Sequence, residues 1–242
     1  MDSYCDFQQD AHETLGHLLN KYSSSCAKAH TLELLTALSM SKEQHTECLP
    51  VLSVDLSTSV QQSITNFLAP NRVYYENKEQ LQLRSVLIAP SCLIVHLRRF
   101  AFVNQHLTLK LTTATAINPT LQLPLPNSQR SVVIKYQLAS LVAHSNKANA
   151  TAANSGHYKC YVPRDKGWLE LDDGSYQEHT ALPREVYSEI IYCFITKCRK
   201  QSTTCIPAHP ECKRFVVKRV SKGSKLSQNG LLVSFLYQKK SV

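Results

Sequence analysis

The chain has 242 residues, 43% hydrophobic and 19% charged, a composition typical of a folded protein with a substantial core. It has no apolar run of the ~20 residues that a membrane span needs, and we expect no signal peptide because the N-terminus is neither basic nor apolar. The nine cysteines form no tight repeat, which indicates a reducing compartment, so we expect the cytoplasm or the nucleus.

The net charge of +9 belongs to one end of the chain. Residues 1–196 hold 16 Lys and Arg against 17 Asp and Glu, whereas residues 197–242 hold 11 against one. We interpret residues 198–242 as a basic tail that is disordered or forms a small hairpin around Asn229–Gly230. Binding to nucleic acid through this tail is the weaker alternative, because the tail has few aromatic residues for stacking on bases.

The first elements are predicted to be helices. Asp6 and Gln9 have the spacing of a capping box, and apolar residues recur at helical intervals from Phe7 to Tyr22. A second helix is predicted over residues 31–40, TLELLTALSM.

Strands follow the helices. After a strand-like stretch from Cys48 and an amphipathic stretch at 60–70, the branched and aromatic residues of 89–103 predict a central strand. The segment INPTLQLPLPN, with its prolines, is expected to be an extended loop. Further strands are predicted at 131–144, 156–162, 167–172 and 190–197. The fold class is therefore α+β, with helices first and a mostly antiparallel sheet after them.

The stretch GHYKCYVPRDKGWLELDD predicts a hairpin that joins a histidine to an aspartate. A four-residue loop at 163–166 would place His157 opposite Asp172, and a five-residue loop at 163–167 would place it opposite Asp173. Directly opposite residues are ~5 Å apart at Cβ, so the side chains could hydrogen-bond. Such a carboxylate would orient an imidazole that acts as a general base. The alternative is a surface hairpin without chemistry, and catalysis would also need a nucleophile from elsewhere.

Five motifs between residues 8 and 197 together resemble the ubiquitin-specific proteases, which are cysteine-dependent deubiquitinases. In chain order they are QQDAHE (a glutamine box), PSCLIVHLRRFAF (a palm strand), YQLASLVAH with SGHYKCYV (a histidine box), WLELDD, and YCFITK (a closing palm strand). The resemblance implies a papain-like fold: part of a helical thumb at 1–43, reduced fingers at 44–88 and an antiparallel palm at 89–197.

The resemblance also implies roles for the residues of the hairpin. His157 would take a proton from a cysteine, Asp172 would orient the imidazole, and Asp173 would support the pair or share its polarisation. The complete enzyme would cleave peptide or isopeptide bonds after the terminal glycine of ubiquitin, through an acyl-enzyme. The implied partners are ubiquitin and ubiquitinated proteins, with no membrane.

Three further residues are implied to bind ubiquitin. Asp10 and Glu13 would meet the arginines of ubiquitin's C-terminal tail, and Tyr158 would wall the channel to the scissile bond. An acidic helix face is also common as plain solvated surface. A non-catalytic ubiquitin-binding module is therefore the second interpretation.

Two departures from the family pattern set further expectations. The family's nucleophilic cysteine opens a helix upstream of the glutamine box, in an Asn-x-Gly-x-Thr-Cys-like segment that this sequence does not contain. Cys5 is a poor substitute, because Asp2, Asp6 and Asp10 surround it and oppose a thiolate. We therefore expect this chain to lack the nucleophile-bearing segment and to be inactive alone. The paired Cys-x-x-Cys ligands of a zinc site are missing from the fingers too, so we expect no metal and no cofactor.

Overall fold

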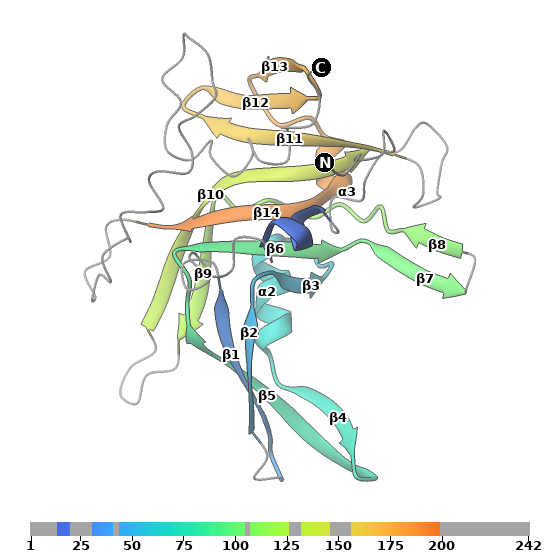
Figure 1. Ribbon diagram of the computed structural model, residues 1–242, viewed down its shortest axis with the longest axis vertical. Coiled ribbons are helices and arrows are strands. Elements are labelled where there is room, and N and C mark those ends of the chain that lie inside the picture. Colours follow the sequence, from blue (N-terminus) through green and yellow to red (C-terminus); the bar gives the residue numbers. More distant parts are fainter. Residues whose placement is uncertain are drawn as a thin grey trace, which may run out of the picture.

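The computed structural model describes residues 14–19, 31–40, 44–104, 107–125, 132–145 and 156–198. Within these ranges the chain is built mostly from antiparallel strands with few helices, as predicted (Figure 1). The helices are a segment at residues 14–19, α2 (Val60–Leu68) and α3 (Val186–Glu189). None of the described helices is long and apolar enough to cross a membrane.

The strands form three sheets. A four-stranded sheet has the order β2-β1-β5-β4, from β1 (Leu32–Leu38), β2 (Gln44–Leu49), β4 (Asn71–Tyr75) and β5 (Lys78–Ile88). A small sheet pairs β7 (Phe100–Asn104) with β8 (Leu107–Lys110). The largest sheet has the order β13-β12-β11-β10-β14-β6-β3, with β9 also paired to β10. Its strands are β3 (Leu52–Asp55), β6 (Cys92–Arg98), β9 (Thr120–Leu125), β10 (Val132–Ser145), β11 (His157–Arg164), β12 (Gly167–Asp172), β13 (Ser175–His179) and β14 (Ile190–Lys197).

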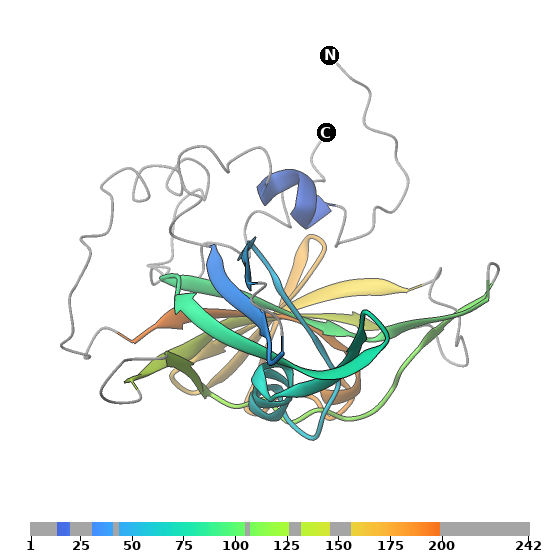
Figure 2. The ribbon, with the colours of Figure 1, turned by 90° about the horizontal axis from the view of Figure 1, so that it is seen from below.

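The largest sheet carries a core on each face. Val60 and Ile64 of α2 pack into one core, and Leu15 of the segment at 14–19 packs into the other. Figure 2 shows these two helical elements on opposite sides of the sheet. The six residues Ile190–Ile195 of β14 are all buried, which explains why this strand is apolar throughout instead of alternating.

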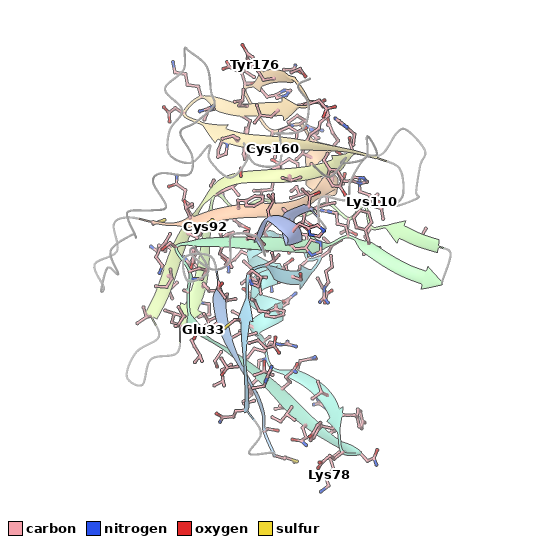
Figure 3. All side chains as sticks on the ribbon, in the orientation of Figure 1. Glu33, Lys78, Cys92, Lys110, Cys160 and Tyr176 are labelled. Carbon is pink, nitrogen blue, oxygen red and sulfur yellow. The ribbon has the colours of Figure 1, made fainter. Side chains whose placement is uncertain are left out.

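The four-stranded sheet extends away from the largest sheet. Lys78 lies at its far end, whereas Cys160 and Tyr176 belong to strands at the opposite end of the molecule (Figure 3). Arg84 on β5 places its guanidinium carbon 4.7 Å from the ring centroid of Phe67 on α2. One face of this sheet is therefore turned toward α2, and the other face is turned away from it.

The predicted helix at residues 31–40 is wrong. Leu32–Leu38 forms β1, which pairs with β2 and β5 in the four-stranded sheet. Leu32 and Leu34 are buried two residues apart, which is the spacing of a strand that faces a core. Pairing on both sides overrides the helix propensity of the leucines and alanine.

Most of the predicted strands are confirmed as β10, β11, β12 and β14. The predicted strand at 89–103 is divided into β6 and β7 by a break at Arg99, so that β7 leaves the large sheet. The predicted loop around residues 117–127 contains β9, an extra strand on β10. Pro124 fits there because β9 has β10 as its only partner among the described strands, so one side of it is open.

Candidate active site

The hairpin of β11 and β12 has a tighter turn than either predicted register. Arg164 pairs with Gly167, which leaves Asp165 and Lys166 as the turn. β11 continues through Pro163 because β10 pairs with it only as far as Tyr161, so the proline can turn its missing N–H to an open side. Both predicted registers are therefore wrong, although the predicted meeting of histidine and aspartate occurs.

His157 reaches Asp172 diagonally across the two strands. The last direct pair is Cys160 with Leu171, so the next position on β11, Lys159, faces Asp172, and His157 lies one side-chain step further along the same face. Diagonal neighbours on a sheet face are within reach of long side chains. His157 Nε2 donates a hydrogen bond to Asp172 Oδ1.

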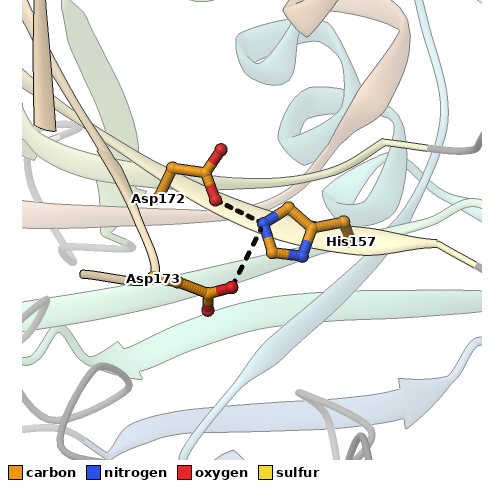
Figure 4. A group of neighbouring side chains, drawn as sticks. All are labelled: His157, Asp172 and Asp173. Carbon is orange, nitrogen blue, oxygen red and sulfur yellow. Dashed lines mark hydrogen bonds and ion pairs between the residues drawn. The ribbon is translucent and has the colours of Figure 1, made fainter. Parts of the chain in front are cut away.

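Asp173 lies beside this pair. Its Oδ2 is 3.9 Å from His157 Nε2, and its backbone has a φ of 49°, in the left-handed region that aspartate tolerates. Figure 4 shows both carboxylates on one side of the imidazole. Because Nε2 carries the donated proton, Nδ1 is the ring atom that can accept one. The His157 side chain is 40% exposed, so a reacting group can approach it.

Lys159 connects Asp172 to a further carboxylate, that of Glu170. Lys159 Nζ lies 2.7 Å from Glu170 Oε1 and 3.1 Å from Asp172 Oδ2. His179 on β13 places Nε2 2.7 Å from the other oxygen of Glu170. Sequence reasoning missed Lys159, Glu170 and His179, and His179 comes from β13, a strand that was not predicted.

The pKa values of the charged groups in this cluster are shifted by their hydrogen-bond partners. Burial alone would raise the pKa of Asp172, but the hydrogen bonds from His157 and Lys159 outweigh it and hold the pKa below its usual 3.8. Burial would likewise raise the pKa of Glu170, whose hydrogen bonds to Lys159 and His179 lower it below 4.5. The hydrogen bond to Glu170 is the main cause that raises the pKa of Lys159 above 10.5. The cluster therefore favours ionised carboxylates and a charged lysine.

These shifts predict how stability depends on pH. A carboxyl with a lower pKa in the folded state contributes stability above its unfolded pKa, and this contribution is lost as pH falls through the folded value. We expect Glu170→Gln to destabilise the protein at pH 7, and its difference from the unmutated chain to shrink below pH ~4. Urea unfolding followed by circular dichroism at several pH values would measure this. Exposed Glu178 on the next strand provides the control, and an equal pH dependence for Glu170→Gln and Glu178→Gln would contradict the assignment.

Two aromatic rings pack against His144, on the strand that pairs with the strand of His157. Buried His144 lies with its ring centroid 4.6 Å from that of Tyr158 and 5.6 Å from that of Phe100. Tyr158 follows His157 in the strand, so it points to the opposite face. Its role as a channel wall stays a prediction, and Asp10 and Glu13 lie outside the described residues.

The five described cysteines are unpaired thiols. Burial raises the pKa of Cys92 and of Cys193 to about 12, and it raises the pKa of Cys160 as well. Cys48 lies in the four-stranded sheet and Cys198 follows β14. No described cysteine makes a hydrogen bond or an ion pair with His157, so the described residues bring the histidine and two aspartates together without a thiol.

The same three side chains could in principle hold a cation. One ligand atom from each of His157, Asp172 and Asp173 lies within 4.8 Å of the others. The ammonium of Lys159 already places a positive charge 3.1 Å from Asp172. We therefore assign these atoms to hydrogen bonding and to the orientation of His157.

Comparison with known proteins points to one family. The model of the family described as "Ubiquitin carboxyl-terminal hydrolase" matches residues 4–202. "Probable ubiquitin carboxyl-terminal hydrolase 16" of Schizosaccharomyces pombe is 21% identical over 248 residues, covering 89% of this chain and 52% of that protein. "Ubiquitin hydrolase B" of Dictyostelium discoideum is 36% identical over 104 residues, covering 40% of this chain and 22% of that protein. The chain thus spans about half or less of the length of these relatives.

Solved structures agree in fold. The SAGA DUB module with Ubp8, bound to ubiquitin aldehyde, matches with a TM-score of 0.66 and 18% identity, over 79% of this chain and 50% of that one. A second structure of this module, bound to monoubiquitin, matches with a TM-score of 0.64 over 79% and 49%. These matches confirm the predicted α+β, partial papain-like fold of thumb, fingers and palm. The chain belongs to the ubiquitin carboxyl-terminal hydrolase family, as a member of the ubiquitin-specific proteases.

Proposed function

We propose that this chain serves cysteine-type deubiquitination, with His157 as the general base and Asp172 as the residue that orients it. The observation that carries the proposal is the hydrogen bond from His157 Nε2 to Asp172 in a chain of this family. Asp173, 3.9 Å from the same nitrogen, adds negative charge that stabilises the imidazolium. The substrate is ubiquitin joined to another protein through its terminal glycine.

In the proposed reaction, a thiol transfers its proton to Nδ1 of His157 and the thiolate attacks the carbonyl carbon of that glycine. The carbon–nitrogen bond then breaks, and the departing amine takes the proton from the imidazolium. Water, deprotonated by His157, hydrolyses the resulting thioester and releases ubiquitin. The Asp172 carboxylate stabilises the cation formed in each half of the cycle.

We place the thiol outside the described residues. The described cysteines make no contact with His157, and three of them are buried with raised pKa values. The family's cysteine segment is absent from the 242 residues, so we expect the chain alone to be inactive. These observations favour a second candidate for the chain by itself, a ubiquitin-binding module without turnover. The unpaired state of the five described cysteines supports a site of action in the cytoplasm or nucleus.

An exposed row of leucines supports ubiquitin binding. Leu81, Leu83 and Leu87 on β5 are 40–43% exposed, whereas Gln80 and Val86 on the alternate face are buried. The leucines thus face away from α2, on a sheet surface that no described element covers. Exposed apolar rows of this kind mark sites of protein association.

We expect Leu83→Arg to weaken ubiquitin binding by at least ~10-fold, because a charge would be buried against an apolar surface. Isothermal titration calorimetry with monoubiquitin would measure the loss. Gln62→Arg on α2 is the matched control, since it adds the same charge on the other side of the sheet and should leave affinity unchanged. Equal affinities for the two variants would show that this leucine row does not contact ubiquitin.

The test of the function itself uses ubiquitin with a thiol-reactive electrophile at its C-terminus, together with the same calorimetry. The expected result is ubiquitin binding without an adduct at any of the five described cysteines. Failure to bind ubiquitin would overturn the proposed function. An adduct at a described cysteine would overturn our placement of the thiol. An adduct at another cysteine, abolished by His157→Ala, would support His157 as the base and overturn the expected inactivity of the chain.

A further inference from the structure

We propose that Lys159 is a positioning residue for His157, acting through Asp172. Glu170, held by His179, supplies a negative charge that offsets the effect of the Lys159 ammonium on Asp172. The inference rests on the proposed role of His157 as a base. Lys159 lies within the SGHYKCYV motif, but the family resemblance assigns no role to its charge.

The first step is geometric. Asp172 has one partner for each carboxylate oxygen, His157 Nε2 on Oδ1 and Lys159 Nζ at 3.1 Å from Oδ2. A carboxylate held at both oxygens cannot rotate without losing one partner. Lys159 therefore fixes which oxygen faces the imidazole, and with it the orientation of the ring.

The second step is electrostatic. Lys159 and a protonated His157 attract the same carboxylate, so the lysine alone would weaken the stabilisation that Asp172 gives to the imidazolium. Glu170 opposes this effect, because its Oε1 lies 2.7 Å from Lys159 Nζ. The ammonium of Lys159 thus interacts with two carboxylates. Glu170 partly neutralises it, so that Asp172 stabilises the His157 imidazolium more strongly.

The third step is the anchoring of Glu170. Its side chain is 9% exposed, and its Oε2 lies 2.7 Å from His179 Nε2 on β13. Tyr161 lies directly opposite Glu170 on β11. The two neighbouring strands, β11 and β13, therefore hold Glu170 in place, and a buried carboxylate with a partner on each oxygen makes a fixed counter-charge.

Other charged groups face the cluster. From the described elements these are Asp173 after β12, and Glu185 and Glu189 beside and within α3, of which Glu189 interacts electrostatically with Lys159 and both interact with Tyr161. These acids remain in every variant below, so their contributions are common to all comparisons.

The test is the pH titration of the His157 imidazole, followed by NMR of the ¹⁵N-labelled chain, which requires neither substrate nor activity. We expect Lys159→Met to move the midpoint of this titration upward by about 0.5–1 pH unit, because Asp172 then serves His157 alone. Lys159→Arg should restore the original midpoint, because it keeps the charge. Glu170→Gln should move the midpoint downward, because Lys159 then draws on Asp172 uncompensated.

The control is Lys166→Met, which removes an exposed lysine in the turn of the same hairpin and should leave the midpoint unchanged. Circular dichroism confirms that each variant is folded. Opposite shifts for Lys159→Met and Glu170→Gln support the proposal when Lys166→Met leaves the midpoint unchanged, because loss of a lysine elsewhere in the hairpin then does not account for them. Unchanged midpoints, or shifts in the same direction, overturn it. Should Lys159→Met fail to fold, Glu170→Gln and Lys159→Arg still decide the question.

This result is independent of the ubiquitin experiments. A chain that fails to bind ubiquitin can still show the two opposite shifts. The failure to bind would overturn the proposed function, whereas the shifts would support the electrostatic role of Lys159. Conversely, if the chain binds ubiquitin but the midpoint of the His157 titration is unchanged in the variants, the proposed function stands and Lys159 has no positioning role.

Discussion

Arg99→Met is expected to lower the free energy of unfolding by at least about 3 kcal/mol, because it leaves several buried carbonyl groups without a donor. Arg99 is fully buried, and its guanidinium donates to the carbonyl oxygens of Ile190, Leu111, Thr113 and Tyr187, at 2.5, 3.0, 2.8 and 3.0 Å. Methionine has a similar length but no donor, so the loss measures the hydrogen bonds.

These bonds hold three segments together. Arg99 lies at the break between β6 and β7, Leu111 and Thr113 follow β8, and Tyr187 lies in α3. Burial lowers the pKa of Arg99 from 12.5 to about 10, so the side chain stays charged at neutral pH, stabilised by carbonyl dipoles and the nearby charge of Glu189. A charged group among carbonyls makes stronger hydrogen bonds than a neutral one.

The neighbouring residue provides the control for this prediction. Arg98 pairs with Asp55 at 2.9 Å, but the two side chains are 50% and 82% exposed. Surface ion pairs of this kind contribute ~0–1 kcal/mol, so Arg98→Met should be close to neutral. Urea unfolding of both variants measures the contrast, and similar losses at positions 98 and 99 would refute the structural role of Arg99.

Gly156→Ala is expected to destabilise the chain by about 1–3 kcal/mol and to disturb His157, because the site has no room for a methyl group. A Cβ atom at Gly156 would lie 2.1 Å from Nε2 and 2.3 Å from Cε1 of His144, and 2.8 Å from the carbonyl oxygen of Ser145. The ring of His144 cannot move aside easily, since it is 3% exposed and packed between Phe100 and Tyr158.

Gly174→Ala is the matched control. A Cβ atom there would meet no atom within 4 Å, in the turn between β12 and β13 that follows Asp173. We expect this variant to be within ~0.5 kcal/mol of the unmutated chain. Urea unfolding gives the stabilities, and the imidazole signals of His157 report the local disturbance. Full tolerance of alanine at position 156 would show that the packing of His144 does not constrain the approach to His157.

The sequence alone predicted most of the strands that form the palm. Ile190–Ile195 and Cys92–Leu97 are runs of branched and aromatic residues, and such runs belong to strands buried on both faces, independently of their partners. The order of the motifs also indicated the family, because each motif is local in the chain. His157 and Asp172 could be paired for the same reason, since the predicted four-residue loop and the observed two-residue turn both place them on one face of the hairpin.

Long-range packing decided the rest. Residues 31–40 have helical propensity, yet pairing with β2 and β5 makes Leu32–Leu38 a strand, and no local pattern records those partners. The break at Arg99 depends on carbonyl groups that lie 12 to 91 residues away in the chain.

The register of β11 and β12 shows the same contrast between local sequence and long-range packing within one hairpin. Sequence reasoning assigned Pro163 and Gly167 to the turn or its border, but β11 continues through Pro163 because the pairing of β11 with its other neighbour, β10, ends at Tyr161. This register places Lys159 between Asp172 and Glu170. The sequence by itself determined which residues could carry the chemistry, because residue type and local order are enough for that. Only the tertiary structure decided which charges meet, because the face and register of a strand are set by its neighbours in the sheet.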